Sequence, residues 1–147
     1  MNGQETWSSE WLDLAEMDLG AAEYLLGMRP VPVEIICYHC EQAAEKMLKG
    51  TLAQFGMEPP KTHDLIQLCK LCMERDPQLA DACVELTPYG VQVRYPSHME
   101  LDESDMNCAL RECRKIREFV LQRLDPHISQ DIKAVTEAKR KFEQHMG

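Results

Sequence analysis

Apolar residues recur at every third or fourth position through most of this 147-residue chain, and that periodicity constrains the fold more than any other feature. It is the spacing of α-helices that each bury one face. Glycines and prolines interrupt it at 27–32, at 56–60, at Pro77 and at Pro126. Only the short segment 89–96 alternates as a strand would. The pattern therefore predicts an all-α fold.

The interruptions divide the chain into four main helices. Since helices joined by short connections pack as antiparallel neighbours, we predict an up-and-down antiparallel bundle. A short extra helix over 78–86 and a C-terminal helix capped by Ser129 complete it. The main helices are expected over roughly 9–26, from after Pro32 to about Phe55, from a Thr62 cap to near Pro77, and from 102–105 to Pro126. The longest stretch without periodicity, 87–101, is the best candidate for a functional loop.

Composition narrows the class of protein. The net charge of -9, from 25 acids and 16 bases, excludes a protein that coats nucleic acid through bulk electrostatics. No apolar run approaches the ~20 residues that cross a bilayer. Seven cysteines, an odd number, and a start without a secretion signal predict reduced thiols and a cytoplasmic location. At 44% hydrophobic residues, a single domain of this length can bury its own core.

Two cysteine pairs have the spacing of zinc ligands: Cys37 with Cys40, and Cys69 with Cys72. In helical projection both pairs fall on the apolar face of their helix, and neither has a glycine or proline nearby to form a metal-binding turn. We therefore expect these cysteines to fill the core, with no metal and no cofactor. A zinc site between the two helices is the alternative. Cys108 and Cys113 are also interpreted as core residues.

The second helix carries a polar strip, because His39, Gln42, Lys46 and Lys49 fall within about 80° of arc. Glu45 is placed opposite the core in the same projection. Ile35, Tyr38 and Leu52 lie on the polar half, which favours a second contact surface such as a symmetric dimer. A solvated helix face with surface ion pairs is the simpler alternative.

Three blocks of this sequence, "CEQAAEKMLKGTLAQFG", "THDLIQLC" and "RYP", occur in an order that resembles the HEPN domain family. The resemblance covers about residues 9–124 of a single domain and leaves 126–147 as a C-terminal helical extension. It implies a helical bundle that usually forms a homodimer, is often encoded beside a small nucleotidyltransferase, and has been suggested to bind nucleotides. The residues that match the family's pattern are Gln42, Glu45, Lys46, Lys49, Thr62, His63, Asp64, Arg94 and Tyr95.

Many relatives of this family are ribonucleases that use an arginine and a histidine, four to six residues apart, across a dimer cleft. Here Arg94 and His98 have three residues between them, and Pro96 is one of these. A literal match at Arg140 and His145 lies beyond the domain. A toxin-like, metal-independent ribonuclease acting through Arg94 and His98 is therefore the alternative to a binding role.

A nucleotide needs cations for its phosphates and a flat surface for its base. Lys46, Lys49 and Arg94 supply the cations, and Tyr95 or Tyr38 the surface, although Arg94 could equally form a structural ion pair. No glycine-rich phosphate loop or recognised nucleophile arrangement is present. We therefore expect a non-catalytic module that dimerises and binds a nucleotide or a nucleotidyltransferase-type partner; an adaptor or antitoxin-like role is a further reading. The expected ligand-binding residues are Gln42, Glu45, Lys46, Lys49, His63, Asp64, Arg94 and Tyr95.

Overall fold

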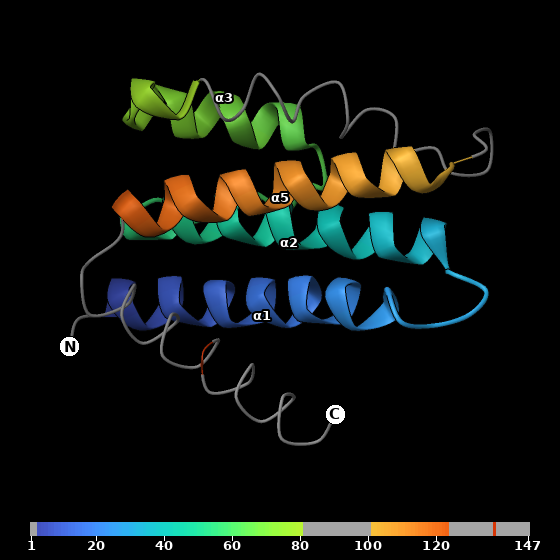
Figure 1. Cartoon of the computed structure of the whole chain (residues 1–147). Coiled ribbons are helices and arrows are strands. Elements are labelled where there is room, and N and C mark those ends of the chain that lie inside the picture. The colour runs from blue at the N-terminus through green and yellow to red at the C-terminus, as the bar shows by residue number, and fades with distance from the viewer. Residues whose placement is uncertain (1–2, 81–100, 124–136, 138–147) are drawn as a thin grey trace.

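The computed structural model describes residues 3–80 and 101–123 together with Glu137. In that part of the chain all regular secondary structure is helical, which confirms the all-α prediction (Figure 1). The predicted short helix begins as a 3₁₀ turn, while its remainder and the C-terminal helix fall outside the described residues except for Glu137, which is helical. The elements are α1 (Gly3–Leu25), α2 (Val33–Gln54), α3 (Leu65–Arg75), η1 (Pro77–Leu79) and α5 (Glu103–Arg123).

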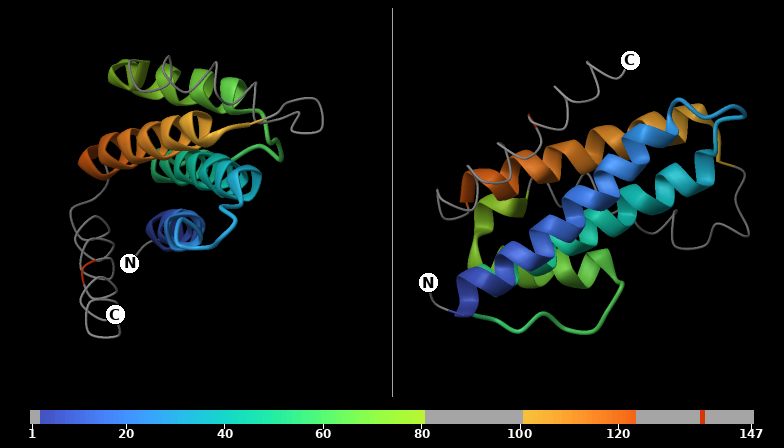
Figure 2. Two further views of the ribbon diagram at one scale, coloured as in Figure 1. Left: turned by 45° about the vertical axis from the view of Figure 1, so that its right-hand side comes forward. Right: turned by 90° about the horizontal axis from the view of Figure 1, so that it is seen from below.

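The directions of the helices differ from a simple up-and-down bundle. α1 runs antiparallel to α2, as predicted, but α3 and α5 both point the same way as α2 (Figures 1 and 2). Side-chain contacts agree: His63, just before α3, meets Glu45 in the middle of α2, and Cys72 further along α3 donates to the carbonyl oxygen of Leu48. The non-helical link 55–64 explains the difference. Ten such residues can span roughly 33 Å, as long as a helix of 22 residues, so the link returns the chain along α2.

α2 is the central element, with α1, α3 and α5 around it (Figure 2). The predicted apolar stripes are buried on every described helix. In its second half α2 is buried almost all round, since Leu48, Leu52 and Ala53 each retain 1% exposure or less. The expectation that Leu52 faces outward is therefore wrong, because neighbouring elements enclose this half of the helix. The predicted stripe residues found buried are Leu12, Ala15, Leu19, Ala22, Leu65, Leu68, Met106, Ala109, Leu110, Cys113, Ile116 and Val120.

The cysteines of both CxxC pairs lie in the core, as predicted from the helical projection. Cys37, Cys40, Cys69 and Cys72 are each at most 2% exposed, and Cys113 is buried with them, while Cys108 is partly buried. Two causes raise the pKa of the Cys113 thiol well above its usual value: the larger is a hydrogen bond with Cys40 and the second is burial. Among residues 3–80 and 101–123 no cluster of three potential metal ligands occurs.

The observed helix boundaries agree with the predicted ones for α2 and differ for α1 and for the cap of α3. α2 spans the predicted range, whereas α1 begins about six residues earlier than expected. Asp64 caps α3 by accepting hydrogen bonds from the backbone N–H groups of Ile66 and Gln67. The predicted cap, Thr62, instead accepts from the N–H of Asp64. That prediction was wrong because the carboxylate, two residues nearer the helix, reaches its free amides directly.

α1 and α2 approach closely at Gly50. The hydroxyl of Ser8 donates to the carbonyl oxygen of Gly50 over 2.8 Å, and the side chains of Leu12 and Trp11 lie where a Cβ on Gly50 would point. Glycine inside a helix normally costs stability, so its presence here is explained by this close contact. In the described ranges, none of the helices combines the length and apolar character of a membrane span.

Candidate functional site

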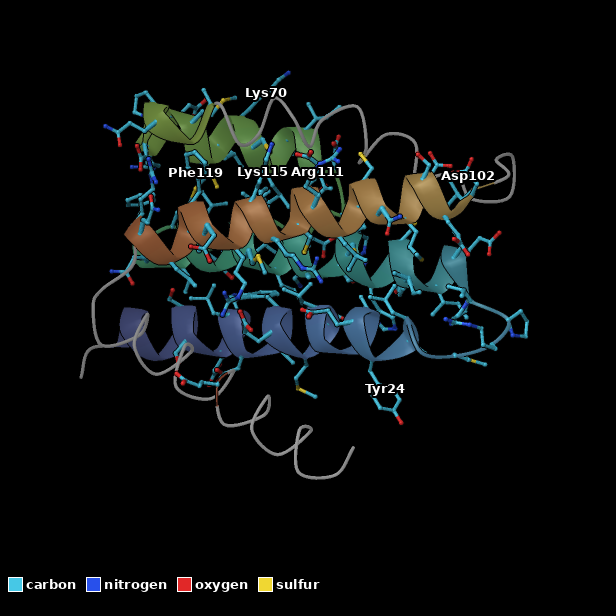
Figure 3. All side chains as sticks on the ribbon, viewed as in Figure 1. Tyr24, Lys70, Asp102, Arg111, Lys115 and Phe119 are labelled. Atoms are coloured by element: carbon cyan, nitrogen blue, oxygen red, sulfur yellow. The ribbon has the colours of Figure 1, made fainter. Side chains whose placement is uncertain are left out.

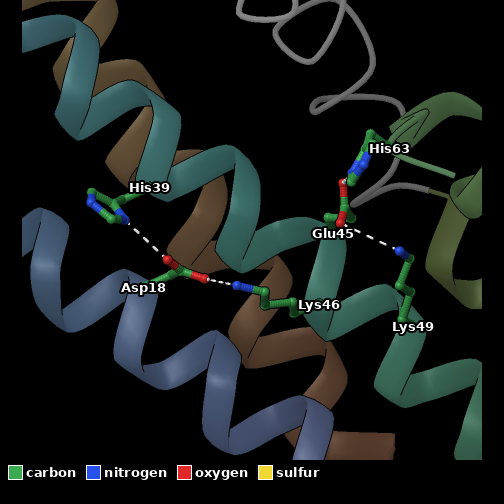
Figure 4. A network of polar contacts seen from close by, with 6 residues as sticks. All are labelled: Asp18, His39, Glu45, Lys46, Lys49 and His63. Carbon is green, nitrogen blue, oxygen red and sulfur yellow. Dashed lines mark hydrogen bonds and ion pairs between the residues drawn. The ribbon is translucent and has the colours of Figure 1, made fainter. Parts of the chain in front are cut away.

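The polar strip of α2 forms two small networks with neighbouring elements (Figure 4). In the first, the carboxylate of Asp18 on α1 binds two groups of α2 at once. One oxygen lies 3.0 Å from Nδ1 of His39, and the other accepts a hydrogen bond from Lys46. Asp18 is 14% exposed and Lys46 22%, so this ion pair is largely shielded from water. It ties α1 to α2 across 28 residues of sequence.

The second network centres on Glu45, whose side chain is only 4% exposed. One of its oxygens lies 3.4 Å from Nζ of Lys49, one turn further along α2, and the other lies 2.9 Å from Nδ1 of His63. The Lys49 ammonium also sits 5.3 Å from the centre of the Trp11 ring on α1. His63 is 82% exposed, so this network reaches the surface through one imidazole (Figure 4).

These contacts show that the polar strip of α2 is not the solvated helix face given above as the simpler alternative. Lys49 is 7% exposed, and Glu45, placed opposite the core by projection, is buried as well. The physical reason is that α1 supplies Asp18 and Trp11 to the polar strip, so the strip lies between two helices instead of on a free face. A polar stripe on a helix becomes interior where a neighbour offers the opposite charge.

The predicted ligand-binding residues are only partly brought together. Gln42, Glu45, Lys46 and Lys49 lie on α2, with His63 and Asp64 just before α3. Arg94, Tyr95 and His98, like Arg140 and His145, lie outside the described residues. A phosphate at Lys46 or Lys49 would have to compete with Asp18 or Glu45, since each ammonium already binds a carboxylate.

The first half of α2 presents an apolar surface. Ile35 is 51% exposed and Tyr38 is 54% exposed, three residues apart on one side of the helix. The Tyr38 ring also packs edge-on against His39 at 5.7 Å between centroids. The prediction of an outward apolar surface on this helix is thus confirmed for Ile35 and Tyr38, though not for Leu52.

A second surface that carries charged side chains lies on α5. Its residues line an open groove of about 390 Å³. Figure 3 shows Arg111, Lys115 and Phe119 along the same side of this helix. These three residues follow one another at intervals of four, which places them on one helix face. In the sequence this pattern is hard to recognise because a further base, Arg117, faces the bundle instead and pairs with Glu16 of α1. The lining residues are Arg111, Arg114, Lys115, Glu118, Phe119 and Gln122.

Two cations of this groove, Arg111 and Arg114, have exposed side chains. Arg111 is 64% exposed and 3.5 Å from a Glu112 oxygen, and Arg114 is 50% exposed and 3.5 Å from Glu23. The Arg114–Glu23 pair is open to water at both ends and contributes about 0–1 kcal/mol, so an anionic ligand can displace it, whereas the Glu112 carboxylate that faces Arg111 is only 8% exposed. By contrast, the enclosed Glu45–Lys49 pair is costly to break.

Comparison with known proteins gives one positive finding. The sequence model of the HEPN domain matches residues 8–124, the greater part of the chain and nearly the span of its described helices. Searches of curated proteins and of solved structures returned no match.

Proposed function

This chain belongs to the HEPN domain family, and from that premise we propose that it is a non-catalytic helical module that dimerises and binds a nucleotide or a nucleotidyltransferase-type partner. The observation that carries the proposal is the exposed apolar surface of Ile35 and Tyr38 on the central helix. The internal pairing of Lys46 and Lys49 gives these lysines a structural role, because each already binds a carboxylate within the bundle.

The dimer contact is proposed at Ile35 and Tyr38. Tyrosine and aliphatic side chains are favoured in the centres of protein interfaces, where charged residues are depleted. With a net charge of -9 on each copy, association through most other surfaces meets electrostatic repulsion. An apolar surface at the open half of α2 allows two copies to meet with the least burial of charge.

Replacing both apolar residues, Ile35→Asp with Tyr38→Asp, is expected to convert the dimer into a monomer. Each copy would place two carboxylates in the contact, and losing an interface anchor costs about 2 kcal/mol or more, roughly 30-fold in affinity. Light scattering after gel filtration measures the mass, which should fall from twice 16.9 kDa to 16.9 kDa.

The matched control for the dimer is Met28→Asp, which places the same charge on an exposed site between α1 and α2. It should leave the dimer intact. A wild-type protein that is monomeric at high micromolar concentration, or a dimer that survives the double substitution, would contradict the proposed contact.

For the nucleotide, the α5 groove is the better-supported position. Arg111, Arg114 and Lys115 line it together with Phe119, whose ring also lies 5.0 Å from the Arg123 guanidinium, so an aromatic surface lies beside positive charge. The set proposed from the sequence, Lys46 and Lys49 with Arg94 and Tyr95, is the alternative position. The choice follows from the magnitudes above, since the groove cations are exposed and those of α2 are enclosed.

We expect Arg111→Ala with Arg114→Ala to weaken nucleotide binding at least about tenfold, because each charge-assisted hydrogen bond contributes about 1.5–3 kcal/mol. Calorimetric titration with a panel of nucleoside mono-, di- and triphosphates measures the affinity.

Arg94→Ala is the companion variant, and a loss of nucleotide affinity confined to it would place the site at the loop 87–101 instead. If no nucleotide binds, the nucleotide half of the proposal fails and only partner binding remains. RNA cleavage by the wild type that His98→Ala abolishes would replace the proposal with the ribonuclease alternative.

A further inference from the structure

The outer face of α1 carries a second apolar surface, separate from Ile35 and Tyr38. Leu14, Met17 and Tyr24 are 46%, 64% and 81% exposed and fall within about 80° of arc on this helix. The Tyr24 side chain points away from α2 and α5 (Figure 3). The three residues, called the α1 stripe below, face opposite to the buried positions Leu12, Leu19 and Ala22.

The charge of α1 selects what can cover this stripe. The helix contains six carboxylates and no basic residue. Asp18 and Glu16 are paired inside the bundle, but Glu10 and Asp13 are exposed beside the stripe. Two copies of α1 facing each other would bring like charges together, which disfavours a second copy as the occupant. The segment that best complements this stripe is therefore an amphipathic one that carries basic residues.

The chain contains such a segment in its last 19 residues. From 129 to 147 it has four Lys and Arg residues against three acids, with three of the bases at 139–141. Its apolar residues Ile132, Val135 and Phe142 are spaced by three and seven residues, and the α1 stripe has the same two spacings. Equal spacing lets two parallel helices place these residues in register. Glu137 is helical and exposed, and in projection it lies opposite Ile132 and Val135.

The link 124–128, between α5 and the C-terminal segment, is long enough for that segment to reach α1. Arg117 of α5 contacts Glu16 of α1, so the end of α5 lies beside the first half of α1 (Figure 1). Residues 124–128 can cover roughly 16 Å when extended, more than the ~10 Å width of a helix. A segment that turns back there runs along α1 in the direction that the register requires.

We propose that residues 129–147 dock as an amphipathic helix on the α1 stripe of the same chain, with Ile132, Val135 and Phe142 against Leu14, Met17 and Tyr24. In this register the basic run 139–141 lies beside positions 21–23 of α1, where Glu23 is the acidic residue. This contact covers the apolar face of α1 without engaging Ile35 and Tyr38, so it is compatible with a dimer through α2.

Trypsin reports on docking because its cleavage sites include Lys139, Arg140 and Lys141. In the full-length wild type, cleavage at these bonds should be slow. Met17→Asp, and separately Phe142→Asp, should accelerate it at least about tenfold, since cleavage follows the population of the undocked segment. Mass spectrometry of the fragments gives the rate at each bond. The matched control, Met28→Asp, adds the same charge at an exposed site between α1 and α2, outside both apolar surfaces, and should leave the rate unchanged.

Circular dichroism at 222 nm confirms that the bundle of each variant stays folded, and hydrogen exchange of amides 129–147 gives a second readout that does not depend on the protease. Rapid cleavage and exchange in the wild type, or rates unchanged by both Met17→Asp and Phe142→Asp, would overturn the proposal. Protection that grows with protein concentration would also overturn it, because the segment would then belong to a second copy.

Discussion

Glu45→Ala is expected to lower the free energy of unfolding by about 3–5 kcal/mol. The substitution removes the carboxylate that neutralises Lys49 and leaves an ammonium that is 7% exposed beside the Trp11 ring. A buried ammonium without its carboxylate has lost its hydration, and only the Trp11 ring is left to offset that cost. The loss should be measured by urea denaturation followed by circular dichroism, at constant pH and salt.

Two comparison variants separate the cost of the unpaired charge from that of lost packing. His63→Ala removes the exposed partner of Glu45 and should cost less than about 1 kcal/mol. Glu45→Leu with Lys49→Met removes both charges and should recover most of the stability lost in Glu45→Ala. A loss below about 1 kcal/mol for Glu45→Ala itself would show that water reaches Lys49 and that this pair is not enclosed.

Gly50→Val is expected to destabilise the protein by about 1–3 kcal/mol, the usual cost of overpacking a filled core. A Cβ at this position would lie 3.0 Å from Cγ of Leu12, 3.1 Å from its Cδ2 and 3.3 Å from Cβ of Trp11. Valine adds two methyl groups to that contact, so α1 must move away from α2. The shift also strains the hydrogen bond from Ser8 to the Gly50 carbonyl.

The matched control is Gly20→Ala on the exposed side of α1, where a Cβ meets nothing within 4 Å. Alanine in a helix interior is more stable than glycine by about 0.5–1 kcal/mol, so this variant should gain stability. Thermal unfolding of both variants gives the sign directly. A gain at Gly50 like that at Gly20 would show that α1 and α2 do not depend on close contact there.

The networks on α2 give three of its charged residues a structural role. Glu45, Lys46 and Lys49 hold α2 to α1 and to the start of α3 through contacts with Asp18, Trp11 and His63. Residues used in this way position the surface formed by Ile35 and Tyr38, because they fix the orientation of the central helix. Substitutions among them should therefore affect stability first and binding only through the fold.

The sequence by itself determined the local structure. The 3.6-residue periodicity set the extents of α2 and α5 and the buried stripes of each helix, and it placed the cysteines of "CYHC" and "CKLC" in the core. Proline and glycine located the breaks. These features could be predicted because each depends on residues within a few turns of one another.

The tertiary structure alone decided helix direction and the partners of polar groups. The link 55–64 returns α3 to the direction of α2, and nothing in its composition distinguishes that path from a short antiparallel turn. Lys46 meets Asp18, 28 residues away, and Arg117 meets Glu16, 101 residues away. Whether a polar stripe is solvated or enclosed depends on which helix lies against it, and one helix's periodicity carries no information about its neighbour's charge.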